Sequence, residues 1–197
     1  MPIRLLKKKT VTVPTVAGWL LLAALLCAGA YCALRGLYPF LSFSSPVGAE
    51  ILVVEGWLSE KNLQQVLQVY KKGAYDEIIV TGGPVLYKTM HQRFDTYADL
   101  TASRLVSFGV PREQVTALPA PSAKKNRTFT SAMVLKNHFV AHGRKPSALD
   151  ICTRGPHARR TRYLFQLALS DDCAVGAIGI DPAEYDGRRW WTASEGI

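Results

Sequence analysis

Several widespread catalytic and nucleotide-binding motifs are missing from this chain of 197 residues. It contains no G-x-S-x-G segment of the α/β-hydrolases, no G-x-x-x-x-G-K-[ST] phosphate loop and no G-x-G-x-x-G dinucleotide fingerprint. It also lacks internal repeats and low-complexity tracts, which excludes repeat architectures. A chain of this length is sufficient for one ordinary domain and a short appendage.

Charge is absent from Thr10 to Leu34, and this gap indicates a membrane segment. Residues 16–34 are almost wholly apolar, and at helical rise they span roughly 28 Å, close to the hydrocarbon thickness of a bilayer. Trp19 and Tyr31 lie near the two ends, where aromatic side chains favour the interface. We predict a transmembrane helix over residues 16–37, preceded by a basic tail over residues 1–15 and followed by a linker over residues 38–48.

The positive charges around this span predict its orientation. Only Arg35 follows the span before Glu50, whereas four positive charges precede it: Arg4, Lys7, Lys8 and Lys9. The positive-inside rule then predicts a cytoplasmic N-terminus and a periplasmic, extracytoplasmic domain held at the inner cell membrane. The alternative is a cleaved signal peptide, since Ala28-Gly29-Ala30 has the small-x-small form of a cleavage site. The apolar run continues past this site to Leu37, which favours a retained anchor.

The remaining residues, 49–197, carry 19 Lys and Arg against 15 Asp and Glu. This excess of about +4 is too small to indicate nucleic-acid binding. Two cysteines, Cys152 and Cys173, fall on predicted strands. If those strands are neighbours, the offset between the two residues exceeds the reach of a disulfide, so we predict two free, buried thiols.

Residues 49–197 alternate between short apolar runs and segments with helical periodicity. Such alternation with continuously apolar strands predicts a three-layer, doubly wound, Rossmann-like α/β domain with a mostly parallel sheet. We predict strands at 51–54, 78–81, 115–118, 148–153 and 174–178, and helices at 60–72, 95–108, 126–141 and 156–170, with Asn126 as a cap. Thr192 to Glu195 has the form of a capping box, so the chain either frays there or stops before a further helix.

Ligands of such sheets bind outside the carboxyl ends of the strands, where two of the following helices begin with basic residues. Because a helix N-terminus is itself positive, this arrangement indicates a bound anion. The candidate ligand-binding residues are Gly82, Gly83, Asn126, Arg127, Thr128, Thr153, Arg154, Arg159 and Arg160. The alternative is that these arginines lie on the solvent face of their helices, as we expect for Arg162.

Two further residues at this edge are candidates for proton transfer. His157 falls in the first turn of a predicted helix, where it could bind an anion, act as an acid or base, or pack in a loop. Glu55 is a candidate base or a salt-bridge partner of an arginine. His138 and His142 have the spacing of a metal pair but lack a third ligand, so we predict no metal site. Arg188-Arg189-Trp190-Trp191 could contact lipid headgroups or pack against the domain.

The residues from about 49 to 178 resemble the YdcF-like family, a domain of unknown function whose membrane-anchored subgroup includes SanA and ElyC. The resemblance is carried by the strand ending in Thr81-Gly82-Gly83, the segment ending in Gly109-Val110-Pro111, and the Asn126-Arg127-Thr128 and Thr153 to Arg160 segments. It implies a Rossmann-like fold and, for anchored members, a role in envelope or peptidoglycan biogenesis. The chain departs from many members at Glu55-Gly56-Trp57 and ahead of Asn126, where lysines replace an acidic residue.

These observations predict a membrane-anchored envelope protein whose domain binds a phosphate-bearing, lipid-linked ligand. If the protein is an enzyme, phosphoester or glycosyl-phosphate chemistry fits best, with His157 or Glu55 moving the proton. The alternatives are a non-catalytic binding or scaffolding module and a nucleotide-derived cofactor at Gly82-Gly83. The sequence does not identify a cofactor or a protein partner.

Overall fold

A computed structural model of the chain describes residues 11–86 and 93–194. The chain divides into two compact units, Met1–Gly36 and Leu37–Ile197. The basic residues predicted to precede the membrane, Arg4, Lys7, Lys8 and Lys9, lie outside the described residues, as does Glu195 of the predicted capping box.

The first helix, α1 (Val16–Leu41), contains the predicted membrane span. It is long and apolar enough to cross a membrane, a property that a signal sequence would share, and none of its residues is buried. Its end differs from the prediction, because the helix continues through Pro39 where we expected an irregular linker. Pro39 lies in the last turn, so its missing N–H removes only one hydrogen bond of the helix.

Five parallel strands form one sheet in the second unit, in the order β3-β2-β1-β4-β5. They are β1 (Ile51–Glu55), β2 (Glu77–Gly82), β3 (Val115–Pro119), β4 (Ala148–Arg154) and β5 (Ala174–Ile180). The order reverses between β1 and β4, as in doubly wound folds. The predicted α/β class and parallel sheet are confirmed, and each strand is one or two residues longer than predicted.

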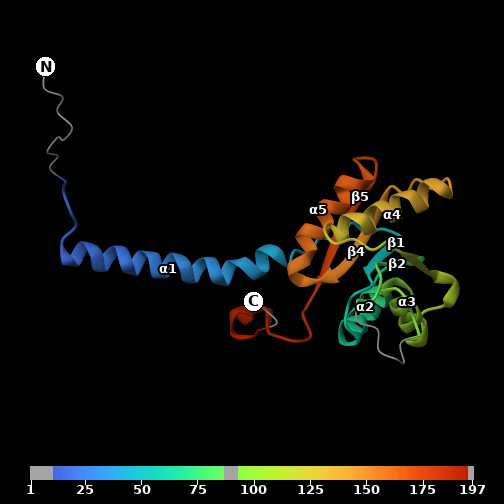
Figure 1. The fold of residues 1–197 in the computed structure, drawn as a ribbon, viewed down its shortest axis with the longest axis horizontal. Coiled ribbons are helices and arrows are strands. Elements are labelled where there is room, and N and C mark those ends of the chain that lie inside the picture. Colours follow the sequence, from blue (N-terminus) through green and yellow to red (C-terminus); the bar gives the residue numbers. More distant parts are fainter. Residues whose placement is uncertain (1–10, 87–92, 195–197) are drawn as a thin grey trace, which may run out of the picture. The chain divides into compact units, whose positions relative to one another are not determined.

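Helices cover both faces of this sheet (Figure 1). They are α2 (Glu60–Lys72), α3 (Tyr97–Ser107), α4 (Arg127–Ala141) and α5 (Ala158–Leu169). Short 3-10 turns precede β3 (η1, Arg112–Gln114) and α5 (η2, Gly155–His157), and a third follows β5 (η3, Gly187–Thr192). The hydroxyls of Ser59 and Thr96 cap α2 and α3 by accepting from the backbone N–H three residues on.

The hydrophobic core consists of one cluster on each face of the sheet. Leu52 and Val54 of β1 pack with α2 and α3, and the intervening Ile51 and Val53 pack with α4 and α5. This alternation follows from the two-residue period of a strand. Burying each such side chain stabilises the fold by roughly 1.5–3 kcal/mol. The three-layer prediction is therefore confirmed, and the sheet is the middle layer.

Residues 42–49, which we name the entry segment, cross the sheet beside β5. Ser45 and Ala177 exchange two antiparallel backbone hydrogen bonds of 2.7 and 3.2 Å. The segment begins next to the carboxyl ends of β4 and β5, because Tyr38 lies against Gly155 and donates to Asp181. It ends at the opposite edge, where β1 starts.

The carboxylate of Asp150 holds the end of the entry segment. This side chain is fully buried and accepts hydrogen bonds from the backbone N–H of Val47 at 2.7 Å and of Ala49 at 3.3 Å. The hydroxyl of Tyr75 donates to the same carboxylate at 3.2 Å. Burial and the adjacent Asp150 raise the pKa of Tyr75. Three donors therefore compensate a charge that would otherwise be strongly disfavoured in the interior.

Cys152 and Cys173 are free and buried, as predicted. Cys152 is paired in register with Ile178, whereas Cys173 precedes the first residue of β5. Burial raises the pKa of both thiols, that of Cys152 to about 12. Both therefore stay protonated at neutral pH and pack as small apolar side chains.

Replacing Gly176 by alanine should destabilise the domain by roughly 1–3 kcal/mol, the usual effect of overpacking an interior. A Cβ atom at this position would lie 1.9 Å from Oδ1 of Asp150 and 2.7 Å from the Val47 nitrogen. Thermal unfolding of the full chain in detergent micelles measures the loss. Gly83→Ala is the matched control, because its Cβ would meet only two carbonyl oxygens at 3.8 Å. An equal fall in melting temperature for both variants would contradict this role of Gly176.

Candidate functional site

A cleft of about 620 Å³ lies at the carboxyl edge of the sheet. The ends of β1 and β2 and the segments that follow β1, β2, β3 and β4 contribute to it, as expected for a doubly wound fold. Its volume is in the range of small-molecule sites, roughly 300–1,000 Å³. The lining residues are Glu55, Trp57, Thr81, Gly82, Gly83, Pro84, Leu86, Tyr97, Ala120, Pro121, Ser122, Ala123, Lys124, Lys125, Asn126, Arg127, Thr128, Ser131, His157 and Arg160.

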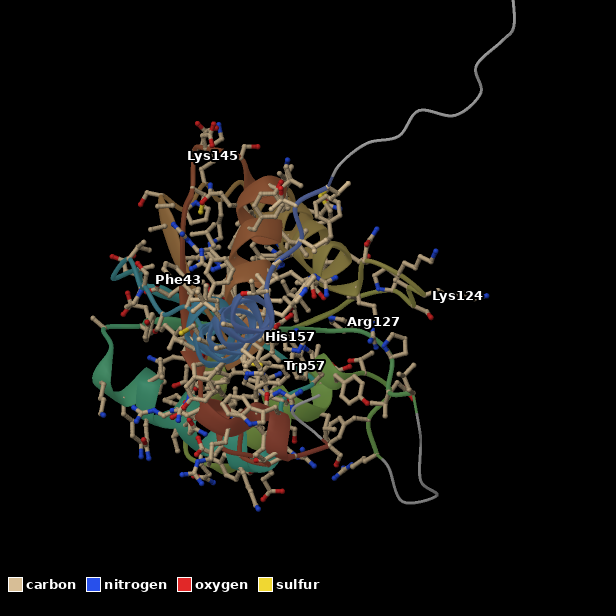
Figure 2. All side chains as sticks on the ribbon, turned by 90° about the vertical axis from the view of Figure 1, so that its left-hand side faces the viewer. Phe43, Trp57, Lys124, Arg127, Lys145 and His157 are labelled. Carbon is tan, nitrogen blue, oxygen red and sulfur yellow. The ribbon has the colours of Figure 1, made fainter. Side chains whose placement is uncertain are left out.

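Four cationic side chains border this cleft. Lys124, Lys125 and Arg127 come from the end of the β3–α4 loop and the start of α4, and Arg160 comes from α5. None of them forms an ion pair with a carboxylate of residues 11–86 or 93–194. Figure 2 shows Lys124 extended outward from the domain. The cleft therefore has an excess of positive charge that the described part of the protein does not neutralise.

The N-terminus of α4 adds to this positive charge. Its first turn contains no acidic residue, and Asn126, Arg127 and Thr128 all line the cleft. Asn126 occupies the cap position, but the prediction that it caps the helix is wrong in one respect. Its side chain makes no capping hydrogen bond, because its backbone is left-handed, with φ 56° and ψ 31°. The first N–H groups of the helix are thus left without a side-chain acceptor from Asn126.

Glu55, the last residue of β1, forms part of the cleft wall but is only 3% exposed. The hydroxyls of Thr153 and Thr161 donate to its carboxylate, the latter at 3.3 Å. Burial raises the pKa of Glu55, and hydrogen bonds from Thr153, Trp57 and Thr161 and the charge of Arg160 partly oppose this shift. Glu55 is therefore a carboxyl group that can hold a proton at a higher pH than an exposed glutamate.

Thr81 lies beside Glu55 in the register of β1 and β2. It is 1% exposed and lines the cleft, and its hydroxyl has no hydrogen-bond partner among the described residues. An unpaired buried hydroxyl costs roughly 1–3 kcal/mol. Thr81 is therefore a further candidate for contact with a ligand oxygen.

His157 lies edge-on to Trp57, with the ring centroids 4.9 Å apart (Figure 2). The guanidinium of Arg154 lies over the Trp57 ring, 5.4 Å from its centroid. Burial lowers the pKa of His157, and the positive charges of Arg154 and Arg160 lower it further. The imidazole is therefore neutral at pH 7 and can accept a proton from a bound molecule.

The cleft contains most of the residues that we predicted for the site. Those present are Glu55, Gly82, Gly83, Asn126, Arg127, Thr128, His157 and Arg160. Three predicted residues do not line it. Thr153 instead supports Glu55 from the interior, and Arg154 pairs with Glu184 at 3.6 Å. The third, Arg159, is directed to Phe40 instead.

Arg159 and Arg160 were both predicted to bind the ligand, but only Arg160 lines the cleft. The Nε atom of Arg159 donates to the carbonyl of Phe40 at 2.6 Å. Its guanidinium lies over the rings of Phe40 and Phe43, 4.2 and 4.9 Å from their centroids. Arg162, predicted to face solvent, is likewise bonded, with its Nε 2.7 Å from the Val175 carbonyl.

The structure changes the interpretation of Gly82-Gly83. A Cβ atom at Gly82 would lie 2.9 Å from both the Ala98 nitrogen and Cβ of Tyr97. Gly82 therefore allows α3 to approach β2, and the closest atoms to a Cβ at Gly83 would be carbonyl oxygens. Thr81, Tyr97 and Ser131 are lining residues that the sequence prediction missed. Only Thr81 had a usable signal, as a polar residue at the end of an apolar strand.

Among the described residues no group of three or more His, Cys, Asp and Glu could hold a metal ion. The rings of His138 and His142 lie 4.3 Å apart, and Nδ1 of His142 is 2.8 Å from the His138 carbonyl oxygen. The two histidines therefore contact each other at the C-terminal end of α4.

No protein-family model and no curated protein matches the chain.

The buried carboxyl of Glu55 should make stability depend on pH in a defined direction. The pKa of Glu55 is higher in the folded than in the unfolded protein. Glu55 therefore contributes fully to the free energy of unfolding below its unfolded-state pKa, near 4.3. This contribution is lost as the pH rises through the folded-state pKa. The stability of Glu55→Gln relative to the wild type should therefore increase between about pH 4 and pH 8. Urea unfolding across this range measures the difference, with the exposed Glu113→Gln as the control. If the difference in unfolding free energy between Glu55→Gln and the wild type did not change with pH, the raised pKa of Glu55 would be contradicted.

Proposed function

We propose that the chain is a single-pass membrane protein whose α/β domain binds a phosphate-bearing ligand in the cleft. The observation that carries the proposal is the meeting of Arg127, Arg160 and the N-terminus of α4 at one cleft. Backbone N–H groups at a helix start and guanidinium groups both bind phosphate oxygens. The hydroxyl of Thr81 offers a further contact deeper in the cleft.

The ligand that we propose is carried by a lipid, such as a polyprenyl phosphate or a lipid-linked glycan precursor. Supporting this, Tyr38 directly follows Leu37, the end of the apolar run, and lies against Gly155. Gly155 begins the turn η2, which brings His157 to the cleft. The chain therefore enters the domain at the same edge of the sheet as the cleft. The resemblance to anchored YdcF-like proteins of envelope and peptidoglycan biogenesis agrees with this choice.

The orientation and the chemistry are parts of the same proposal. The basic flank before the span favours a cytoplasmic N-terminus and an extracytoplasmic domain at the inner membrane. If the ligand is turned over, phosphoester cleavage fits the groups present. Water would attack phosphorus and give its proton to neutral His157, while the oxygen of the breaking P–O bond would take a proton from Glu55.

One observation favours a non-catalytic binding module instead. The carboxylate of Glu55 already accepts hydrogen bonds from Thr153, Thr161 and Trp57. A carboxyl group held by three donors is well placed to stabilise the edge of the cleft without exchanging a proton with a ligand.

Replacing Arg127 or Arg160 by glutamine should weaken binding of farnesyl phosphate roughly ten- to a hundredfold, the range for a lost charge-assisted hydrogen bond. Isothermal titration of the full chain in detergent measures the affinity, with farnesol and adenosine monophosphate as comparison ligands. Arg104→Gln is the matched control, because Arg104 is in the last turn of α3 and does not line the cleft. Unchanged affinity in both cleft variants would contradict the proposal, and tighter binding of adenosine monophosphate would favour a nucleotide-derived ligand.

His157→Ala distinguishes the enzyme from the binding module. If His157 accepts the proton of the attacking water, the variant should release inorganic phosphate from farnesyl phosphate at least about a hundredfold more slowly. Binding should stay within about threefold, because a neutral imidazole adds little to the attraction of an anion. Phosphate release is measured by a colorimetric assay. Equal release by variant and wild type, together with intact binding, would contradict a catalytic role of His157.

A further inference from the structure

The 3-10 turn η3 near the end of the chain combines two arginines with two tryptophans. Arg188 and Arg189 are exposed, and the rings of Trp190 and Trp191 lie edge-on with centroids 5.9 Å apart. The side chain of Asp186 starts the turn by accepting from the Arg188 N–H at 2.9 Å. The proposed function does not use this segment, since none of its residues lines the cleft.

The structure places η3 against the residue that follows the apolar run. A Cβ atom at Gly187 would lie 2.1 Å from Cζ of Tyr38, so the start of the turn packs against that ring. Tyr38 directly follows Leu37. The tryptophans and arginines of η3 are therefore held next to the point where a membrane span would end.

An aromatic and a basic side chain also meet at the last turn of α1, which contains Tyr38. Phe40 is 58% exposed, and Arg159 lies over its ring and donates to its carbonyl. We name this set the collar: Phe40, Arg159, Arg188, Arg189, Trp190 and Trp191. The neighbouring acidic side chains have these partners: Asp181 accepts from Tyr38, Glu184 pairs with Arg154, and Asp186 accepts from the backbone N–H of Arg188.

We propose that the collar lies in the headgroup region of the bilayer and binds anionic phospholipids. Tryptophan favours the interface between lipid and water, and arginine near an anionic membrane surface is attracted by its phosphates. This inference rests on the proposed membrane span. Its consequence is that the carboxyl edge of the sheet is held toward the lipid, since Tyr38 contacts both η3 and Gly155.

Quenching of tryptophan fluorescence by brominated lipids tests the inference on the full chain. The protein is reconstituted in vesicles of phosphatidylcholine brominated near the headgroup, with or without phosphatidylglycerol. Subtracting the emission of Trp190→Phe/Trp191→Phe isolates this pair from Trp19 and Trp57, the other tryptophans of the chain. We expect the pair to be quenched in the anionic vesicles and to lose most of this quenching in 1 M NaCl, where the Debye length is about 3 Å.

Charge variants test the role of the arginines. The collar is in equilibrium between a membrane-bound and an unbound state, and one arginine near an anionic surface changes this equilibrium roughly fivefold. Arg188→Gln/Arg189→Gln should therefore lower the ratio of bound to unbound collar about 30-fold. Lys71→Gln/Lys72→Gln is the matched control, because it removes the same charge from the last turn of α2.

Each outcome decides the inference. Quenching of Trp190 and Trp191 that depends on phosphatidylglycerol and on both arginines supports it. Quenched Trp19 with an unquenched pair would overturn it and leave the membrane span intact. If neither is quenched, both the span and the collar are wrong. An equal loss in the lysine variant, or quenching that is the same without anionic lipid, would overturn the proposed headgroup binding.

Discussion

The central strand β1 is buried on both faces and hydrogen-bonded along both edges, and the position of the other elements follows from it. Its neighbours β2 and β4 pair with it in parallel, so their carboxyl ends and the turns that follow lie together. The last residue of this strand is a glutamate. A carboxylate at the end of a fully buried strand must be hydrogen-bonded to be tolerated, and Thr153 of β4 and Thr161 of α5 supply the donors. The centre of the hydrophobic core and the wall of the cleft are thus parts of one strand.

Positive charge is concentrated where the backbone already has a positive potential. Acidic residues are the usual occupants of a first helical turn, whereas α4 begins with Arg127 after two lysines, and its cap residue offers no side-chain oxygen to the helix. Such an arrangement reduces the stability of the isolated protein, and an anion bound at this helix start would restore the lost stability. The unpaired hydroxyl of Thr81 is a second group of this kind in the same cleft. Both observations favour a site selected for binding over one selected for stability.

The fold was predictable from the sequence because parallel strands are continuous apolar runs and the helices between them have a clear 3.6-residue period. Side-chain directions were less predictable. Arg159 and Arg160 are adjacent in the sequence, but successive residues of a helix point about 100° apart, so one reaches the cleft and the other reaches Phe40. The extension of α1 through Pro39 was missed because a proline in a last turn resembles a helix breaker. The failure of Asn126 to cap α4 depends on its left-handed backbone, which the residue type allows but does not require.

The entry segment has a second effect, on association between molecules. β5 is an outer strand, and an uncovered outer strand is a template for pairing with another chain. Ser45 pairs with the backbone groups of Ala177, and the Val47 nitrogen lies beside Gly176 of β5, where it donates to the side chain of Asp150 in β4. The stretch of chain that leads from the apolar helix into the domain therefore also blocks edge-to-edge aggregation. A soluble fragment that began at Ala49 would expose this edge, which would make it prone to self-association.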